Sequence, residues 1–224
     1  MERIIAIDGP AASGKSTLAK NLSRVLGFLY LDTGAMYRAI ALKAKRSGIA
    51  SDDAPSLSQI AETARIELTT ENGSQRVLLD GQDVTDEIRL PEISTLASEV
   101  SVHSGVRRAM VRLQRQMAQL GRGLVCEGRD TTTVVFPKAR LKIFLTASAQ
   151  ARAMRRCKEL EERGTPISYE DALSQIIERD RRDSTRADSP LVKAADAVEI
   201  DTDDLSIEEV LAVALEHWRR RDVD

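Results

Sequence analysis

Residues 9–16 read Gly-Pro-Ala-Ala-Ser-Gly-Lys-Ser and fit the pattern G-x-x-x-x-G-K-[ST] of a phosphate-binding loop. An apolar run at residues 4–7 precedes the loop and predicts a buried strand, and a helical apolar pattern follows it. The glycines let successive backbone N–H groups converge on a polyphosphate at a helix N-terminus. The motif and its surroundings therefore indicate binding of a nucleoside triphosphate.

Each position of the loop has an expected contact with ATP as the phosphoryl donor. Lys15 would neutralise the β- and γ-phosphates, and the Ser16 hydroxyl is the expected ligand of Mg²⁺. A glycine-rich turn that binds nothing is the alternative, and the strand-loop-helix context argues against it. The expected nucleotide contacts are Gly9, Pro10, Ala11, Ala12, Ser13, Gly14, Lys15, Ser16 and Thr17.

Two arginine-rich segments further along the chain have helical spacing. Arg179, Arg182, Asp183 and Arg186 are spaced i, i+3, i+4, i+7 and would share one helical face. Arg152, Arg155 and Arg156 repeat the i, i+3, i+4 spacing on the preceding predicted helix. A solvated face is the usual interpretation of one such helix. Two arginine faces on consecutive helices can instead neutralise a phosphoryl group during transfer.

Two shorter clusters follow predicted strands. Asp32-Thr33-Gly34, with Arg38 one turn later, fits either an ordinary helix cap or a ligand site. Arg129 and Asp130 fit either a structural ion pair or a phosphate clamp beside an acceptor for a base or sugar. His103 and His217 lack the neighbours of a nucleophile or metal ligand, and transfer onto an anionic phosphate oxygen needs no general base.

The composition limits the class of protein. Of the 224 residues, 42% are hydrophobic, enough for a packed core, and the net charge of −2 gives no global basic surface for nucleic acid. Aromatic residues are only 3%, which removes the stacking platforms of a single-strand binder. We see no signal-peptide layout and no long apolar run, and Cys126 and Cys157 lack metal-ligand spacing. A cytoplasmic protein that binds neither nucleic acid nor membrane is expected.

Short apolar runs alternate with helical patterns, which favours a parallel sheet covered by helices on both faces. We predict a three-layer α/β fold of the P-loop type with a five-stranded parallel sheet. The predicted strands are Arg3–Asp8, Phe28–Leu31, Leu124–Glu127, Leu141–Leu145 and Ala197–Asp201. The predicted helices are Lys15–Leu26, Ala35–Ser47, Val106–Leu120, Ala147–Glu162, Tyr169–Arg182 and Ser206–Arg220.

Two segments interrupt this core of residues 1–62 and 97–224. Short apolar runs separated by Asn-Gly and Asp-Gly predict an antiparallel β insert at 63–96. Residues 152–169 contain a charged turn broken by Gly164 and Pro166, and we interpret them as a short helical lid. Such a hinge can close over bound substrates and exclude water. We expect both segments to be the most mobile without ligand.

Together these residues resemble the family of bacterial cytidylate (CMP) kinases over nearly the whole chain. The run Asp32-Thr33-Gly34-Ala35-Met36-Tyr37-Arg38 and the insert residues 83–89 are the most specific signatures. The other signatures are residues 7–10, 127–130 with 134–137, and 189–191 before 194–196. Two departures from the family are Ser104, where proline is usual, and Thr131-Thr132, where Ile-Gly is usual.

The resemblance assigns roles to the clusters above, and it implies that the 63–96 insert binds the acceptor nucleotide. It implies that Thr33, Tyr37, Arg38 and Arg129 surround the acceptor phosphate. It further implies that Ser98, Arg107 and Asp130 read the cytosine and that Arg179 and Asp183 bind the sugar. Arg186 would join the phosphate clamp. With the arginine faces, the expected catalytic set is Lys15, Arg129, Arg155, Arg182 and Arg186.

The expected reaction is transfer of the ATP γ-phosphoryl group to CMP or dCMP, with Mg²⁺, by a monomer. One alternative is another small-acceptor P-loop kinase, acting on AMP, UMP or shikimate. The other is a nucleotide-dependent switch without turnover, which would need loops that sense the γ-phosphate but not two arginine faces.

Overall fold

The computed structural model describes residues 3–71, 74–119 and 123–221. The chain divides into two compact units: Met1–Leu29 with Arg122–Asp224 form the first, and Tyr30–Gly121 form the second.

A five-stranded sheet contains β1 (Ile4–Asp8), β2 (Leu29–Asp32), β6 (Leu124–Gly128), β7 (Leu141–Thr146) and β8 (Val198–Asp201) in the order β2-β6-β1-β7-β8. β1 pairs in parallel with both β6 and β7, and β7 pairs in parallel with β8. All residues of β1 and β6 are buried, as expected for central parallel strands that read as continuous apolar runs. The predicted α/β fold with a parallel sheet is confirmed.

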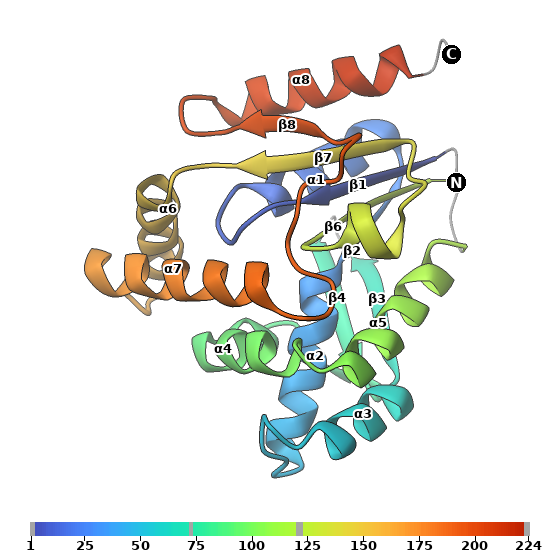
Figure 1. The fold of residues 1–224 in the computed structure, drawn as a ribbon, viewed down its shortest axis with the longest axis vertical. Helices are drawn as coiled ribbons and strands as arrows, with labels where there is room; N and C mark the ends of the chain where they lie inside the picture. Colours follow the sequence, from blue (N-terminus) through green and yellow to red (C-terminus); the bar gives the residue numbers. More distant parts are fainter. Residues whose placement is uncertain (1–2, 72–73, 120–122, 222–224) are drawn as a thin grey trace. The chain divides into compact units, whose positions relative to one another are not determined.

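Among its described residues, the first unit contains four α-helices: α1 (Lys15–Leu26), α6 (Ala149–Glu162), α7 (Tyr169–Thr185) and α8 (Ile207–Arg220). α1 packs on β6 and on α8, and α8 also contacts β7 (Figure 1). α6 and α7 pack against each other through small and branched side chains, and serine side chains cap the N-termini of α6, α7 and α8. The helix starts therefore agree with the sequence signals.

The second unit carries the smaller, antiparallel sheet. β3 (Ile66–Glu71), β4 (Ser74–Leu79) and β5 (Gln82–Asp83) pair in the order β3-β4-β5. Its helical elements are α2 (Thr33–Arg46), α3 (Ala54–Thr63), η1 (Glu87–Arg89), α4 (Pro91–Val100) and α5 (Ser104–Met117). α2 packs on α4, and α3 packs on α5.

All three antiparallel strands lie within the predicted 63–96 segment. Asp80 and Gly81 join β4 to β5 with φ values of 52° and 84°, as the predicted Asp-Gly turn requires. The Asn72-Gly73 turn and Leu120, the predicted end of a helix, lie outside the described residues. The limits of the insert and of the lid remain predictions.

Helices α3 and α4 were not predicted from the sequence. Both have proline in their first turn, and the Asp53 carboxylate caps α3 by accepting from the Ser56 backbone N–H at 3.1 Å. These start signals were available, but their apolar stripes are short. Among the described residues, no helix combines the length and apolar character needed to cross a membrane.

An aromatic cluster anchors α8 in the first unit. The ring centroids of Phe28 and Trp218 lie 5.6 Å apart, with the ring planes at 86°. The Arg140 guanidinium lies 4.6 Å from the Trp218 centroid, and the Arg3 guanidinium lies 5.6 Å from that of Phe28. Edge-to-face and cation–π geometry add to the area that these large rings bury.

Trp218→Ala should lower the free energy of unfolding by about 3–5 kcal/mol, because it leaves a cavity and removes both ring contacts. Urea unfolding followed by circular dichroism measures this change. Arg220→Ala is the matched control: its side chain is 69% exposed and pairs with Glu216 on the surface of the same helix. The control should change stability by less than about 0.5 kcal/mol. An equal effect of the two variants would contradict an anchoring role for Trp218.

Candidate active site

The phosphate-binding loop joins β1 to α1 and needs glycine at two positions. A Cβ atom on Gly9 would lie 2.2 Å from the carbonyl oxygen of Leu145, so no larger residue fits there. Gly14 has φ +90°, a left-handed conformation, and immediately precedes α1. Gly14 has no side chain with which to cap the helix. Backbone N–H groups of the first turn are therefore suited to an anion.

The Lys15 side chain is buried against its own loop. Its Nζ donates to the Pro10 carbonyl oxygen at 2.6 Å and lies 3.4 Å from Ser13 Oγ. Burial lowers the pKa of Lys15 to about 7, and the positive charge of Arg129 acts in the same direction. The negative charges of Glu127 and Asp8 oppose this shift. An anion in the loop would favour the charged form of Lys15.

Asp8, the last residue of β1, is fully buried directly before the loop. Its Oδ1 accepts from the backbone N–H and hydroxyl of Thr131, at 2.9 and 2.8 Å. Its Oδ2 accepts from the same two groups of Thr132, at 2.7 and 2.6 Å. Burial raises the pKa of Asp8, although these four hydrogen bonds act to lower it.

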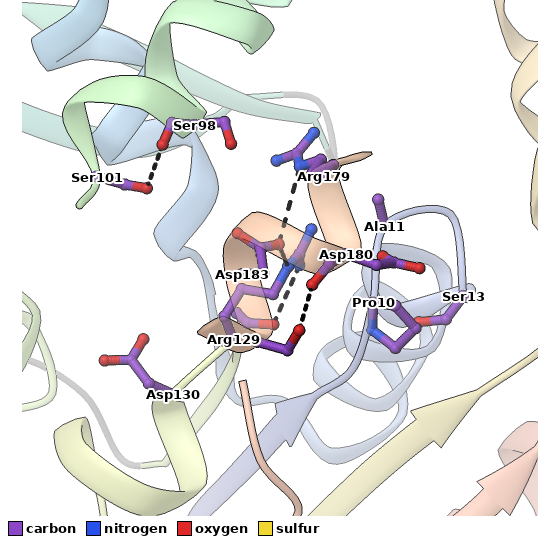
Figure 2. Close-up of polar contacts among 12 residues, drawn as sticks. Pro10, Ala11, Ser13, Ser98, Ser101, Arg129, Asp130, Arg179, Asp180 and Asp183 are labelled. Atoms are coloured by element: carbon purple, nitrogen blue, oxygen red, sulfur yellow. Dashed lines mark hydrogen bonds and ion pairs between the residues drawn. The ribbon is translucent and has the colours of Figure 1, made fainter. Parts of the chain in front are cut away.

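Asp183 is the centre of a cluster of predicted site residues from the first unit. Its carboxylate accepts from Arg129 Nε at 2.7 Å and lies 4.0 Å from Arg179 Nε (Figure 2). It also lies 4.0 Å from Arg186 Nη1. Burial acts to raise the pKa of Asp183, but the three arginines hold it below the ordinary value. Arg186, only 4% exposed, also lies 3.9 Å from Asp130. The structure therefore brings these five predicted residues together.

The arginines of α6 contact the surroundings of the loop. Arg152, which is buried, pairs with Asp180 of α7 at 2.7 Å and donates to the Ala11 carbonyl oxygen at 3.3 Å. Arg155 donates to Thr202 Oγ1 at 2.9 Å, and that hydroxyl lies 3.4 Å from the Ser13 carbonyl oxygen. The first predicted arginine face is thus tied to the loop by hydrogen bonds.

Arg182 lies on the second predicted face, on α7. Its guanidinium is 3.5 Å from Glu178 one turn earlier, and 29% of its side chain is exposed. Arg182 is therefore more accessible than its neighbour Asp183, which is 6% exposed.

The remaining predicted residues lie in the second unit. Arg107, which is buried, donates to the Ser101 carbonyl oxygen at 3.1 Å, and its guanidinium lies 5.6 Å from the Tyr37 ring centroid. The Ser98 carbonyl oxygen accepts from Ser101 Oγ at 3.0 Å (Figure 2). This part of the predicted site is therefore preorganised by contacts within its own unit.

Thr33 and Arg38 lie at the start of α2 in the same unit. Asp32 caps the helix through the Ala35 backbone N–H at 2.8 Å and pairs with Arg38, also at 2.8 Å. Burial acts to raise the pKa of Asp32, but Arg38 and the cap hold it below the ordinary value. The structure confirms the helix cap, and the interpretation of this turn as a ligand site stays a prediction.

The residues of the loop fit a magnesium–nucleotide complex. Ser16 is exposed at the start of α1, so its hydroxyl is accessible to a cation. Mg²⁺ usually takes one or two protein oxygens together with phosphate oxygens and water. Within the described ranges, no three histidine, cysteine, aspartate or glutamate side chains form a possible metal cluster.

Sequence reasoning missed three residues that build the site: Asp8, Glu127 and Thr202. Asp8 stands between an apolar strand and the loop, and this position could have indicated a role. Glu127 is buried, and its negative charge acts to raise the pKa of Lys15. Thr202 contacts Ser13, far away in the sequence, and no local pattern indicates such a contact. Arg152 was a predicted site residue, but its contact with Ala11 was not predicted.

Comparison with known proteins gives close relatives over most of the chain. The sequence model of the family described as cytidylate kinase matches residues 5–220. The curated cytidylate kinase of Pelotomaculum thermopropionicum is 53% identical over 208 residues, 92% of this chain and 92% of that protein. The cytidylate kinase of Solibacter usitatus is 50% identical over 220 residues, 97% of this chain and 93% of that protein.

A solved structure of an uncharacterized protein from Eubacterium ventriosum covers 97% of this chain and 99% of its own, with a TM-score of 0.53 and 11% identity. At this identity the likeness concerns the fold alone. The family model and the two relatives extend over nearly the whole sequence and agree with each other. The chain belongs to the cytidylate kinase family.

Proposed function

We propose that this protein transfers the γ-phosphoryl group of ATP to CMP or dCMP, forming ADP and CDP or dCDP. The observation that carries the proposal is the arginine cluster around Asp183, built in the same unit as the phosphate-binding loop of a cytidylate kinase family member. Phosphoryl transfer depends mainly on positioning and charge neutralisation. Because the acceptor is already an anionic phosphate, histidine-free chemistry is sufficient.

The loop and Lys15 would bind the donor. In this proposal the backbone N–H groups of residues 9–17 surround the ATP phosphates. Lys15 leaves the Pro10 carbonyl oxygen and pairs with phosphate oxygens. Ser16 would hold Mg²⁺, which supplies positive charge between the phosphates. The buried position of Lys15 supports this role, because an electrostatic interaction is stronger where water is excluded.

A second set of residues would bind the acceptor. Arg129, Arg38, Thr33 and Tyr37 are proposed to contact its phosphate. The base would be read by Ser98, Arg107 and Asp130, and the sugar by Arg179 and Asp183. Two observations support the assignment: Arg107 is held in place by Ser101 and Tyr37, and Arg129 is held by Asp183.

Arg155, Arg182 and Arg186 would complete the catalytic arginines. Arg186 is held between Asp130 and Asp183, so its charge is preorganised. The 152–169 lid and the 63–96 insert would close over the bound nucleotides and exclude water, so that hydrolysis does not compete. The core of residues 1–62 and 97–224 would carry the donor site. Action as a monomer in the cytoplasm is part of the proposal.

Cytosine nucleotides should be the preferred acceptors. Arg107 offers hydrogen-bond donors, and Asp130 offers a carboxylate that can accept from the cytosine amino group. Uracil presents a carbonyl in place of that amino group, and mispairing of this kind costs about 1–3 kcal/mol per group. A coupled ADP-release assay with CMP, dCMP, UMP, AMP and shikimate measures kcat/KM for each acceptor. A higher value for UMP, AMP or shikimate would contradict the proposal, and absence of multiple turnover would indicate a switch.

The stability of the ligand-free protein should depend on pH through Lys15. Its pKa of about 7 in the folded chain is below the ordinary 10.5, so between these values the unfolded chain binds more protons. Stability from this group therefore rises with pH in that window, by at most about 1.4 kcal/mol per pH unit. Urea unfolding from pH 6 to 9 should show this rise in the wild type relative to Lys15→Met. Parallel pH curves for the two proteins would contradict the lowered pKa.

Arg186→Ala should lower kcat by about 10²–10³-fold and raise either KM far less, because Arg186 would meet charge that develops in the transition state. Steady-state kinetics with ATP and CMP varied separately gives the three constants. Arg181→Ala is the matched control, because Arg181 lies on the same helix, is 68% exposed and pairs with Glu178. The control should retain wild-type constants. If both variants have the same kcat, Arg186 is only part of a structural ion pair.

A further inference from the structure

The four hydrogen bonds of Asp8 connect two parts of the first unit that are distant in sequence. On one side, Asp8 is followed directly by Gly9, the first residue of the phosphate-binding loop. On the other side, Thr131 and Thr132 directly follow Arg129 and Asp130. The carboxylate is therefore a rigid link between the start of the donor loop and the two residues proposed for the acceptor.

The threonines also begin an unusual helical turn. Residues Thr131–Val135 form the π-helix η2, and the Asp130 carbonyl oxygen accepts from Val134 N at 2.9 Å and Val135 N at 3.1 Å. η2 packs on β1 and β6. Asp130 is thus held by its own carbonyl from one side, and its successor Thr131 is held by Asp8 from the other. π-Helical turns of this kind are costly and occur often at functional sites.

A purely structural helix cap would need only the two backbone N–H donors. Here the two hydroxyls approach the carboxylate as closely as the backbone groups do, at 2.8 and 2.6 Å, and the side chains of both threonines are fully buried. When a buried carboxylate loses one donor, one of its oxygens lacks a hydrogen bond. The free-energy cost is larger than the net contribution of an ordinary hydrogen bond. Each hydroxyl therefore contributes to the geometry of the turn that begins with Asp130.

We propose that Asp8 is a positioning residue, which acts through the hydroxyls of Thr131 and Thr132 to hold Arg129 and Asp130 in the geometry that binds the acceptor nucleotide. The proposal rests on the proposed function, because it takes Arg129 and Asp130 as acceptor-binding groups. It predicts that loss of a threonine hydroxyl weakens binding of the acceptor nucleotide. Binding of the donor nucleotide should not change, because Asp8 remains part of β1 and still precedes the loop.

The test compares variants that separate the hydroxyl from the shape of the side chain. Thr132→Val keeps the shape and removes the hydroxyl, whereas Thr132→Ser keeps the hydroxyl and removes a methyl group. Thr132→Val should raise the KM for CMP about tenfold, with the KM for ATP within about twofold of wild type. Thr132→Ser should have a KM for CMP within about threefold of the wild-type value. Thr131→Val tests the other oxygen in the same way if Thr132→Val fails to fold.

Thr133→Val is the control, because the Thr133 hydroxyl lies in the same turn and, within the described residues, has no hydrogen-bond partner. It should leave both KM values unchanged. A second readout needs no activity: backbone hydrogen exchange at residues 131 and 132 should accelerate in Thr132→Val and not in Thr133→Val.

The outcomes separate this inference from the proposed function. Faster exchange together with a CMP-specific rise in KM supports it. Unchanged exchange overturns it whatever the activity, and so does faster exchange with an unchanged KM for CMP. A defect in Thr132→Ser that Thr132→Val lacks also overturns it, because packing would then be the cause. If the wild type does not phosphorylate CMP although exchange accelerates in Thr132→Val, the proposed function fails and the acceptor role of the Asp8 contact fails with it.

Discussion

The candidate site depends on the burial of several positive charges close to one another in a single compact unit. Burial lowers the pKa of Lys15. Burial acts in the same direction on Arg129, but Arg129 keeps its positive charge, because the Asp183 carboxylate beside it holds the arginine pKa high. Asp183 remains ionised because it faces arginines at close range. Three arginines around one carboxylate form a surrounding that suits a phosphate. The ion pairs hold these arginines in place.

The same unit also buries a negatively charged group, the carboxylate of Asp8. No cation contacts it within hydrogen-bond distance in the described part of the chain, and four neutral donors from Thr131 and Thr132 satisfy it instead. Neutral donors can keep a carboxylate in place without drawing positive charge away from the phosphate loop. This division explains why arginines surround Asp183 whereas hydroxyls surround Asp8.

Much of this architecture follows from local sequence patterns. The alternation of apolar runs and helical periods predicts the parallel sheet and α1, whose limits agree with the prediction. Helices α3 and α4 were not predicted, because each buries only a few apolar side chains and has a weak helical pattern. Motif positions likewise indicate Lys15, Arg129 and Asp183 as site candidates. The partners of Asp8 lie 123 and 124 residues away in the sequence, so only tertiary packing brings them together.

Binding of a phosphate would exchange partners rather than create new charges in the site. Lys15 now donates to the Pro10 carbonyl oxygen and Arg129 to Asp183, so each already has an ordered geometry without a ligand. Such preorganisation lowers the entropy cost of binding, because the side chains are already ordered before the ligand binds. It also limits affinity, since each ligand contact must replace an existing one. Such a site stabilises the transition state more than the bound substrate when negative charge increases during the reaction. The more highly charged transition state then binds the cationic side chains more strongly than the carboxylates and carbonyls that it displaces.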